Sequence, residues 1–87
     1  MSDDQQPDEV LARWVTALVA ELGLDPDAAA GTPGLLDMTK VVAHTVVRPA
    51  APVSALLCGL AAGRAGGSAA DIQQALDRAT ELAERWS

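Results

Sequence analysis

The stretch that decides the fold of this chain is VVAHTVVRPAAP, from Val41 to Pro52. It begins as an apolar helix in which His44 and Arg48 lie four residues apart. Proline disfavours helical geometry in the residue before it, so this helix is predicted to end just before Pro49. A second helix is expected to start at Pro52, because a proline is well accepted in a first helical turn. The stretch therefore predicts a corner between two apolar helices.

The sequence on both sides of this corner predicts further helices. Apolar residues recur every three or four positions before Gly23, a residue that suits a helix end. Ser68 and Asp71 resemble a capping box, in which two side chains satisfy free backbone groups at a helix start. We therefore expect four helices, over residues 8–22, 33–47, 52–64 and 69–87. Asp25 and Pro26 form another helix-start signal, but the sequence leaves open whether residues 26–31 are helical.

Composition and pattern together predict an all-α fold, either a four-helix bundle or a compact orthogonal helical array. The hydrophobic fraction of 49% is typical of a folded protein and consists mostly of Ala, Leu and Val, with no Phe or Tyr. No strand pattern and no internal repeat is visible in the sequence. We expect a disordered tail over residues 1–7 and a single helical domain with a small core over residues 8–87.

The helix expected over residues 52–64 is apolar on every side, and such a helix is normally buried on every side. Gly59 and Gly63 lie four residues apart, so they are expected to form a groove in which another helix packs closely. An 87-residue chain has difficulty surrounding a central helix completely. Either the other helices enclose it within a monomer, or a second copy or another protein covers one face. A homodimer and a self-contained monomer both stay open.

Charge and cysteine content exclude several classes of function. The net charge of -6 and the scattered basic residues argue against nucleic acid, which needs clustered Lys and Arg. The longest apolar run, from Pro49 to Gly63, is too short to predict a membrane span. A lone cysteine and a single histidine offer no zinc-ligand spacing, so neither a metal nor a cofactor is expected. The acidic start of the chain is unlike a secretory signal, so a cytoplasmic location is expected.

Four ionisable residues on and after the predicted second helix form the candidate site. Asp37, His44 and Arg48 share one stripe of the predicted second helix, and Lys40 lies beside it. A guanidinium donates two parallel hydrogen bonds to a phosphate or carboxylate, so these residues could bind an anion. The alternative is structural. Arg48 would then cap the helix end and pair with a carboxylate, and His44 would donate to a backbone carbonyl of the corner.

No catalytic residue is predicted. Cys58 lies in an apolar helix without a neighbouring histidine, where a thiol normally serves only for packing. The serines and threonines of the chain lack a recognisable base or a nucleophile turn. The sequence therefore favours a protein that binds over one that catalyses a reaction by itself.

Several blocks of this sequence resemble a small actinobacterial domain of unknown function, DUF6457, over about residues 10–84. The matching blocks are Trp14, 18–24, 35–37, 42–52 and 59–63, and the block from His44 to Pro52 is the most specific. The resemblance implies that such domains occur alone and also fused behind a nucleotidyltransferase, which attaches guanylate to molybdopterin. It thereby implies an accessory role in molybdenum-cofactor biosynthesis, with that nucleotidyltransferase as a partner.

The sequence supports two functional hypotheses. The first is a non-enzymatic accessory domain that docks on a partner or on itself, with a link to the biosynthesis of molybdopterin guanine dinucleotide. The second is a binding module for a small anionic ligand, such as a phosphate, a pterin or a nucleotide. In the second hypothesis the stripe of Asp37, His44 and Arg48 holds the ligand.

Overall fold

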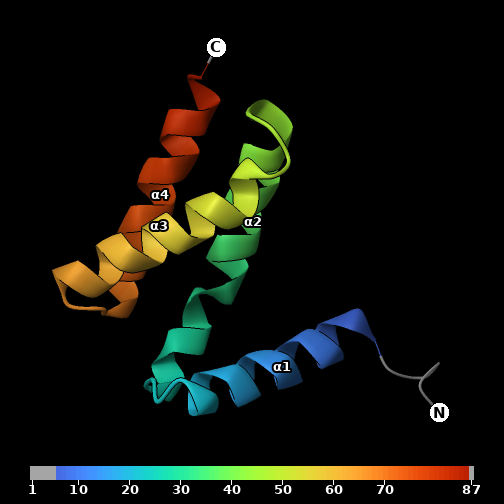
Figure 1. The fold of residues 1–87 in the computed structure, drawn as a ribbon, viewed down its shortest axis with the longest axis vertical. Coiled ribbons are helices and arrows are strands. Elements are labelled where there is room, and N and C mark those ends of the chain that lie inside the picture. Colours follow the sequence, from blue (N-terminus) through green and yellow to red (C-terminus); the bar gives the residue numbers. More distant parts are fainter. Residues whose placement is uncertain (1–5, 87) are drawn as a thin grey trace.

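The computed structural model describes residues 6–86, which contain four α-helices and one short 3-10 helix (Figure 1). Their bounds are α1 (Pro7–Glu21), η2 (Pro26–Gly31), α2 (Thr32–Thr45), α3 (Ala50–Ala65) and α4 (Ala69–Glu84). No strand occurs within these residues, so the all-α prediction is confirmed. The segment that the sequence left open, residues 26–31, is helical. The tail expected over residues 1–7 falls largely on residues 1–5, outside the described part, whereas Pro7 already begins α1.

The end of α1 follows from a glycine. Gly23 has a φ of 70°, a left-handed conformation that glycine adopts without steric penalty. This turn lets the N–H of Leu24 donate to the carbonyl of Val19 at 2.9 Å. The N–H of Gly23 donates to the carbonyl of Ala20 at 3.1 Å. Two carbonyls of the last helical turn thereby gain partners, and the predicted stop at Gly23 is confirmed.

Side-chain caps set the starts of α4 and η2. The hydroxyl of Ser68 accepts the N–H of Asp71 at 3.0 Å, and the Asp71 carboxylate accepts the N–H of Ser68 at 3.1 Å, so the capping box is confirmed. Asp25 accepts the N–H two residues later at 2.8 Å. Thr32, by contrast, does not cap α2. Its hydroxyl donates to the carbonyl of Ala29 at 2.8 Å, and η2 leads into α2 directly.

The corner between α2 and α3 lies two residues earlier in the chain than the prolines predicted. α2 ends at Thr45, because Val46 leaves the helical region with a ψ of -81°. α3 begins at Ala50, two residues before Pro52. Pro52 is accepted there because the first four N–H groups of a helix have no partner within the helix in any case. Residues 46–49 therefore connect the two helices, and both predicted boundaries move toward the N-terminus.

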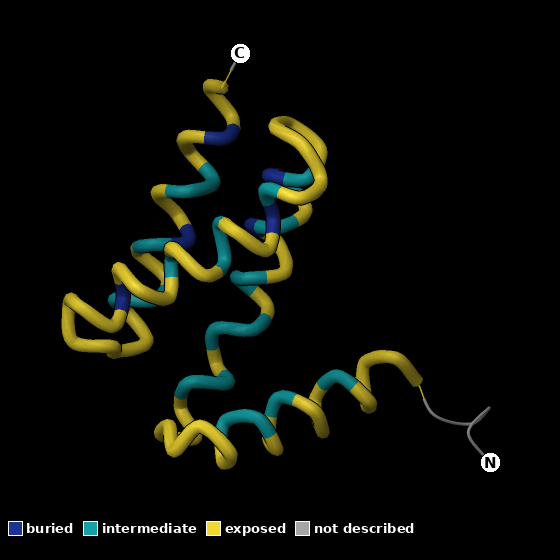
Figure 2. The backbone as a smooth tube through the Cα atoms, in the orientation of Figure 1, coloured by how far each residue is buried: buried dark blue, intermediate teal, exposed yellow. Residues whose placement is uncertain are grey.

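The core lies among α2, α3 and α4, which pack against one another. Its buried residues are Met38, Val42, Ala51, Ala62, Leu76 and Ala83. Most of these are small, and Met38 is the one large side chain among residues 6–86 that is fully buried. Figure 2 shows how little of the backbone is buried. The core is therefore small, as the chain length predicts.

The prediction that α3 is buried on every side is wrong. α3 buries only Ala51 and Ala62, and four large apolar side chains on its opposite side are more than half exposed. These four side chains belong to Val53, Leu56, Leu57 and Leu60. The reason is that α3 contacts only α2 and α4 within the described residues. α2 and α4 cover one side of α3, and no other helix of the described residues covers its outer side.

The helix that could have covered α3 lies elsewhere. α1 contacts the other described elements only through η2 and runs away from the body formed by α2, α3 and α4 (Figure 1). The Cα radius of gyration is 13.9 Å, whereas a compact domain of this length has a radius of about 12 Å. Trp14, expected on the buried stripe of α1, is 60% exposed. The fold is thus a three-helix body with a projecting helix.

Candidate functional site

The structure does not assemble the predicted anion site. Asp37, Lys40 and His44 lie on α2, but Arg48 lies in the connection beyond the helix end, so the four residues share no continuous helical stripe. All four side chains are exposed. None of them makes a hydrogen bond or an ion pair with another residue between 6 and 86.

The structural alternative for these residues is not observed in the described part of the chain either. Backbone bonds hold the corner: the N–H of Ala50 donates to Val47 at 3.0 Å, and the N–H of Ala51 donates to Arg48 at 3.1 Å. The end of α2 is closed by the N–H of Val46, which donates to the carbonyl of Val42 at 2.9 Å. Side chains of His44 and Arg48 are therefore not what holds these helices together.

Replacing Arg48 with alanine should leave stability almost unchanged. The guanidinium is exposed and has no partner in the described chain, and surface substitutions of this kind change the free energy of unfolding by about 0.5 kcal/mol or less. Urea unfolding followed by far-UV circular dichroism measures the change. A loss above about 1.5 kcal/mol would show that Arg48 does tie the corner to another element, because broken buried networks cost that much or more.

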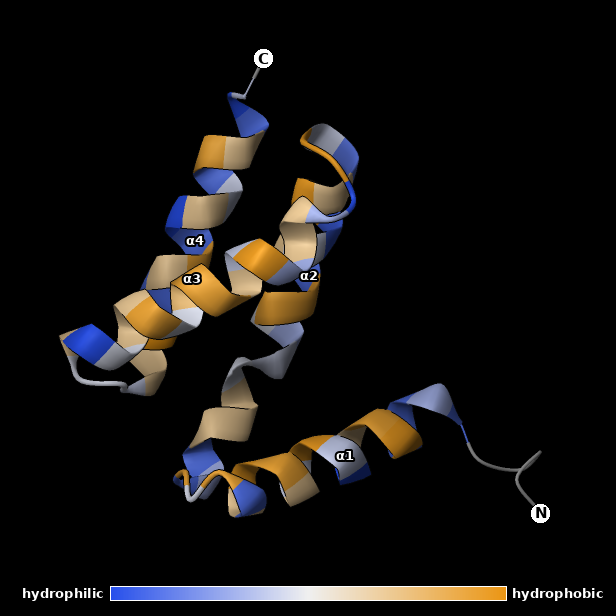
Figure 3. Ribbon diagram, in the orientation of Figure 1, coloured by the Kyte–Doolittle hydropathy of each residue, from blue (hydrophilic) through white to orange (hydrophobic). Residues whose placement is uncertain are grey.

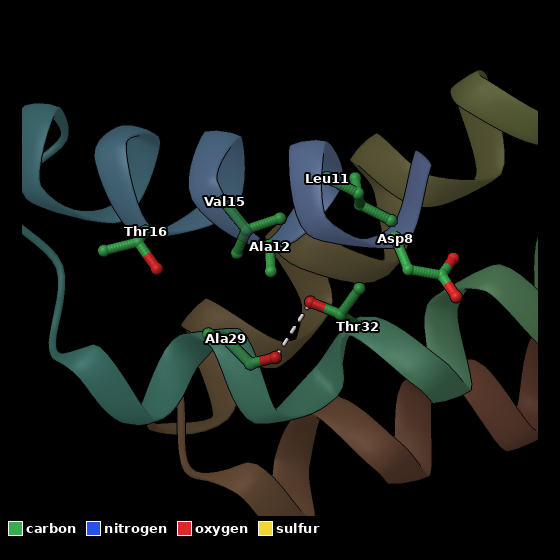
Figure 4. A pocket seen from close by; sticks show the side chains of 7 residues that line it. All are labelled: Asp8, Leu11, Ala12, Val15, Thr16, Ala29 and Thr32. Atoms are coloured by element: carbon green, nitrogen blue, oxygen red, sulfur yellow. Dashed lines mark hydrogen bonds between the residues drawn. The ribbon is translucent and has the colours of Figure 1, made fainter. Parts of the chain in front are cut away.

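The main hollows of the surface do not involve these four residues. One hollow of about 320 Å³ lies between α1 and the η2–α2 junction, where Leu11 and Val15 face Ala29 and Thr32 (Figure 4). A wider groove of about 630 Å³ runs between α3 and α4. Both are open to solvent and shallow. The groove between α3 and α4 is lined by charged side chains, among them Arg64, Arg78 and Arg85, but neither hollow encloses the space that a small-molecule site normally provides.

The most unusual feature of the surface is the outer side of α3. Val53, Leu56, Leu57 and Leu60 repeat at helical spacing on the side opposite the buried alanines. We call these four residues the α3 face. Figure 3 shows hydrophobic colour along this helix where no other ribbon covers it. A contiguous apolar stripe of this kind is uncommon on a protein that works as a monomer.

Two glycines adjoin the α3 face. Gly59 and Gly63 are exposed, and a Cβ built at either position would have no atom within 4 Å. The expectation that another helix of this chain packs into their groove is therefore not met within the described residues. The groove is open, and it lies on the same exposed surface as the leucines. A helix from outside the chain could approach the α3 backbone closely there.

Charges frame the α3 face at both ends. Between residues 50 and 63 the chain carries no charged side chain, while Arg48 precedes α3 and Arg64 lies in its last turn. Both arginines are exposed. The surface is thus an apolar stripe along a 16-residue helix, with one guanidinium near each end.

The α1 helix carries a second apolar surface without cover in the described chain. Its inner side contacts η2, as Leu11 and Val15 show in Figure 4. Trp14 and Val10 flank that inner side and are exposed. Sequence reasoning predicted this apolar stripe but not its exposure. Periodicity indicates which side of a helix is apolar, not what lies against it.

Cys58 lies on the inner side of α3 and serves for packing. It is partly buried, and its thiol contacts the carbonyl of Ala75 in α4 at 3.6 Å. Burial raises the pKa of the Cys58 thiol above its usual value of 9.0. The thiolate, which is the nucleophilic form, is therefore less populated than in an exposed cysteine.

The raised pKa of Cys58 predicts a loss of stability at high pH. Above about pH 9 the thiol ionises in the unfolded chain but stays protonated in the folded one, so the unfolded state binds fewer protons. The free energy of unfolding should then fall as the pH rises through this range. Urea unfolding at several pH values measures the slope. The Cys58→Ala variant should lose this part of the slope, and an identical slope in both proteins would contradict the assignment.

Comparison with known proteins places the chain in a family. The family model described as a domain of unknown function, DUF6457, matches residues 6–87. No curated protein and no solved structure matches the chain. Among the described helices, none combines the length and the apolar character that crossing a bilayer requires. Within the same residues, no three His, Cys, Asp or Glu side chains lie close enough together to hold a metal ion.

Proposed function

Because this chain belongs to the DUF6457 family, whose description states no activity, we propose a function from its surface: a non-enzymatic domain that docks on a protein partner. The observation that carries this proposal is the α3 face. Its four large apolar side chains are between 55% and 64% exposed. Burying one such side chain is worth about 1.5 to 3 kcal/mol, so covering all four provides a substantial driving force for association.

The chemistry of the partner follows from the shape and charge of the α3 face. A single helix lying along α3 would cover the leucines and enter the open groove beside Gly59 and Gly63. Acidic groups at the ends of that helix would face Arg48 and Arg64. Charged pairs at the rim contribute mainly to orientation and association rate, whereas the apolar centre supplies the affinity.

The family resemblance suggests which protein to test as the partner. It implies fusion with a nucleotidyltransferase that attaches guanylate to molybdopterin. We therefore propose this enzyme as the protein that the domain assists, with the domain as an accessory docking part in molybdenum-cofactor biosynthesis. The support is the resemblance together with the exposed α3 face, and the experiment below tests both.

A binding experiment with a matched control tests this function. Purified nucleotidyltransferase is titrated into the wild-type chain by isothermal titration calorimetry, then into the Leu60→Glu variant and the Leu36→Glu variant. Both leucines are largely exposed, at 62% and 47%, so neither substitution should unfold the chain. We expect at least about ten-fold weaker binding for Leu60→Glu and unchanged binding for Leu36→Glu. Absence of binding by the wild type, or equal binding by all three proteins, would refute the proposal.

The anion-binding alternative has one observation in its favour. Lys40, His44 and Arg48 have no partner in the described chain and are therefore free to contact a ligand. Against it, they are spread over an exposed surface without a hollow. We expect neither inorganic phosphate nor guanosine monophosphate, at millimolar concentration, to shift the melting temperature. A shift that disappears in the Arg48→Ala variant would restore this alternative.

A further inference from the structure

We propose that the α3 face binds helix α1 of a second copy of this chain, in a reciprocal two-fold dimer. The inference rests on the proposed function only in taking the α3 face as a docking surface. It makes α1 of a second copy the occupant when the nucleotidyltransferase is absent, so the two would compete for this face. Each copy would offer its α1 to the α3 face of the other. The exposed area, the projection of α1, the charges and the glycine groove each support this occupant.

The first support is the amount of surface. A compact monomer of 8.9 kDa exposes about 4,800 Å², whereas this chain exposes 6521 Å². The six terminal residues outside the described part could account for about 1,000 Å² of the excess at most. About 700 Å² remains. A standard stable interface covers about 800 Å² per partner, so the excess matches what one such interface would remove.

The second support is that α1 and α3 both have uncovered apolar sides, and that one helix could cover the other. α1 spans 15 residues and α3 spans 16, so the two helices are about 22 and 24 Å long. Trp14 and Val10 on α1, and the leucines of the α3 face, are exposed apolar groups. Within one chain α1 and α3 do not touch, since α1 is held by η2 and points away from α3 (Figure 1). A contact between α1 and α3 could therefore form only between two copies.

The third support is charge. α1 carries Glu9 in its first turn and Glu21 at its end, and both side chains are exposed, whereas Asp8 lines the inner hollow. The α3 face lies between Arg48 and Arg64. Either orientation of α1 along α3 thus brings acidic groups toward a guanidinium at each end, which favours association.

The same charges disfavour the two homotypic pairings. An antiparallel α3–α3 contact would bring Arg64 of one copy near Arg48 of the partner. An antiparallel α1–α1 contact would bring Glu9 near Glu21 of the partner. Like charges placed opposite one another across an interface are destabilising. The pairing of α1 with α3 is the one that avoids both repulsions.

The groove beside the α3 face provides room for the largest side chain of α1. Nothing lies within 4 Å of the Cβ positions of Gly59 and Gly63, so a partner side chain has room beside Leu56 and Leu60. Trp14, near the middle of α1, is 60% exposed. Tryptophan is the residue most often found as the central anchor of an interface. Trp14 seated in the glycine groove therefore gives the proposed contact its centre.

Sedimentation equilibrium of the full chain tests this dimer. The wild type should sediment as a dimer of twice 8.9 kDa at micromolar concentration. Trp14→Glu and Leu60→Glu should each raise the dissociation constant at least about ten-fold, whereas Leu36→Glu should not. Far-UV circular dichroism establishes that each variant is folded, and Val53→Glu replaces Leu60→Glu if that variant is not. A monomeric wild type, or a Trp14→Glu variant that dimerises as tightly as the wild type, would overturn the inference.

An experiment that mixes the Trp14→Glu and Leu60→Glu variants distinguishes the reciprocal α1–α3 dimer from other dimers. The Trp14→Glu chain keeps an intact α3 face, and the Leu60→Glu chain keeps an intact α1. Their mixed dimer retains one undamaged contact, while each variant alone retains none. The mixture should therefore associate more tightly than either variant by itself. If the mixture associates no more tightly than the single variants, the α1–α3 pairing is overturned. If the wild type is a monomer that still binds the nucleotidyltransferase, this inference is overturned but the proposed function is not.

Discussion

Replacing Leu76 with alanine is expected to lower the free energy of unfolding by about 2 to 5 kcal/mol. Leu76 is 3% exposed and belongs to the buried cluster with Met38, Val42 and Ala83. The substitution removes three carbons from this cluster and leaves a cavity that α2 and α4 cannot close fully. A domain of this size loses about 4 to 8 °C of melting temperature per kcal/mol, so the decrease should be at least about 8 °C.

Leu82→Ala is the matched control for this prediction. Leu82 lies on the same helix and is 47% exposed, so its removal should cost less than half as much. Thermal and urea unfolding, both followed by far-UV circular dichroism, measure the two variants under one set of conditions. Equal losses for Leu76→Ala and Leu82→Ala would mean that the core is not where the fold places it.

The size of the expected loss follows from the small core. Domains of this kind are stable by about 5 to 15 kcal/mol, and a small core places this chain toward the lower end. A single deletion at Leu76 would therefore remove a large share of the total stability. The small core also explains why this chain gains stability when association covers further apolar surface.

Local signals in the sequence were sufficient to predict most helix ends. Gly23 ends α1 because its backbone accepts a conformation that few other residues adopt. Ser68 and Asp71 begin α4 because each satisfies a backbone N–H of the other. These signals depend on residues close together in the chain. Tertiary contacts are not needed to interpret them.

The packing of α1 and α3 could not be predicted from the same information. An apolar stripe indicates that burial of a side is favourable, but not which surface supplies it. α1 and α3 could in principle have covered each other within one chain. The η2 segment instead directs α1 away from the body, and this direction depends on packing of η2 against α2 and α4.

The expected stripe of the candidate anion site is interrupted for a related reason. Its stripe assumed that the helix continues to Arg48, whereas α2 ends at Thr45. The hydroxyl of Thr45 donates to the carbonyl of Val41 at 2.8 Å, so a side chain partners a carbonyl in the last turn. Helical spacing brings side chains onto one stripe only while the helix lasts. Proline-based boundaries locate the end of a helix only to within a few residues, and here the helix ends three residues before Arg48, so Arg48 does not share the stripe.

Two glycine substitutions three residues apart are expected to change stability in opposite directions. Gly66 has a φ of 126°, a conformation that side chains with a Cβ rarely adopt, so Gly66→Ala should cost about 1 to 3 kcal/mol. The new Cβ would also lie 3.2 Å from the Asp71 carboxylate, which caps α4. Gly63 lies within α3 and has open space around it, so Gly63→Ala should stabilise the isolated chain by about 0.5 to 1 kcal/mol.

Urea unfolding at a protein concentration below the dissociation constant of any dimer measures both effects on the single chain. Losses of similar size for Gly66→Ala and Gly63→Ala would contradict the assignment of Gly63 to an uncovered helical position. The comparison also bears on why α3 carries glycine there. An alanine would stabilise the helix at no steric cost within the chain, so the glycine has no advantage for folding. If the groove receives Trp14 of a second copy, Gly63→Ala should make the single chain more stable and the dimer weaker. A gain in the stability of the single chain together with a loss in dimer affinity distinguishes a docking groove from an exposed helix surface without a partner.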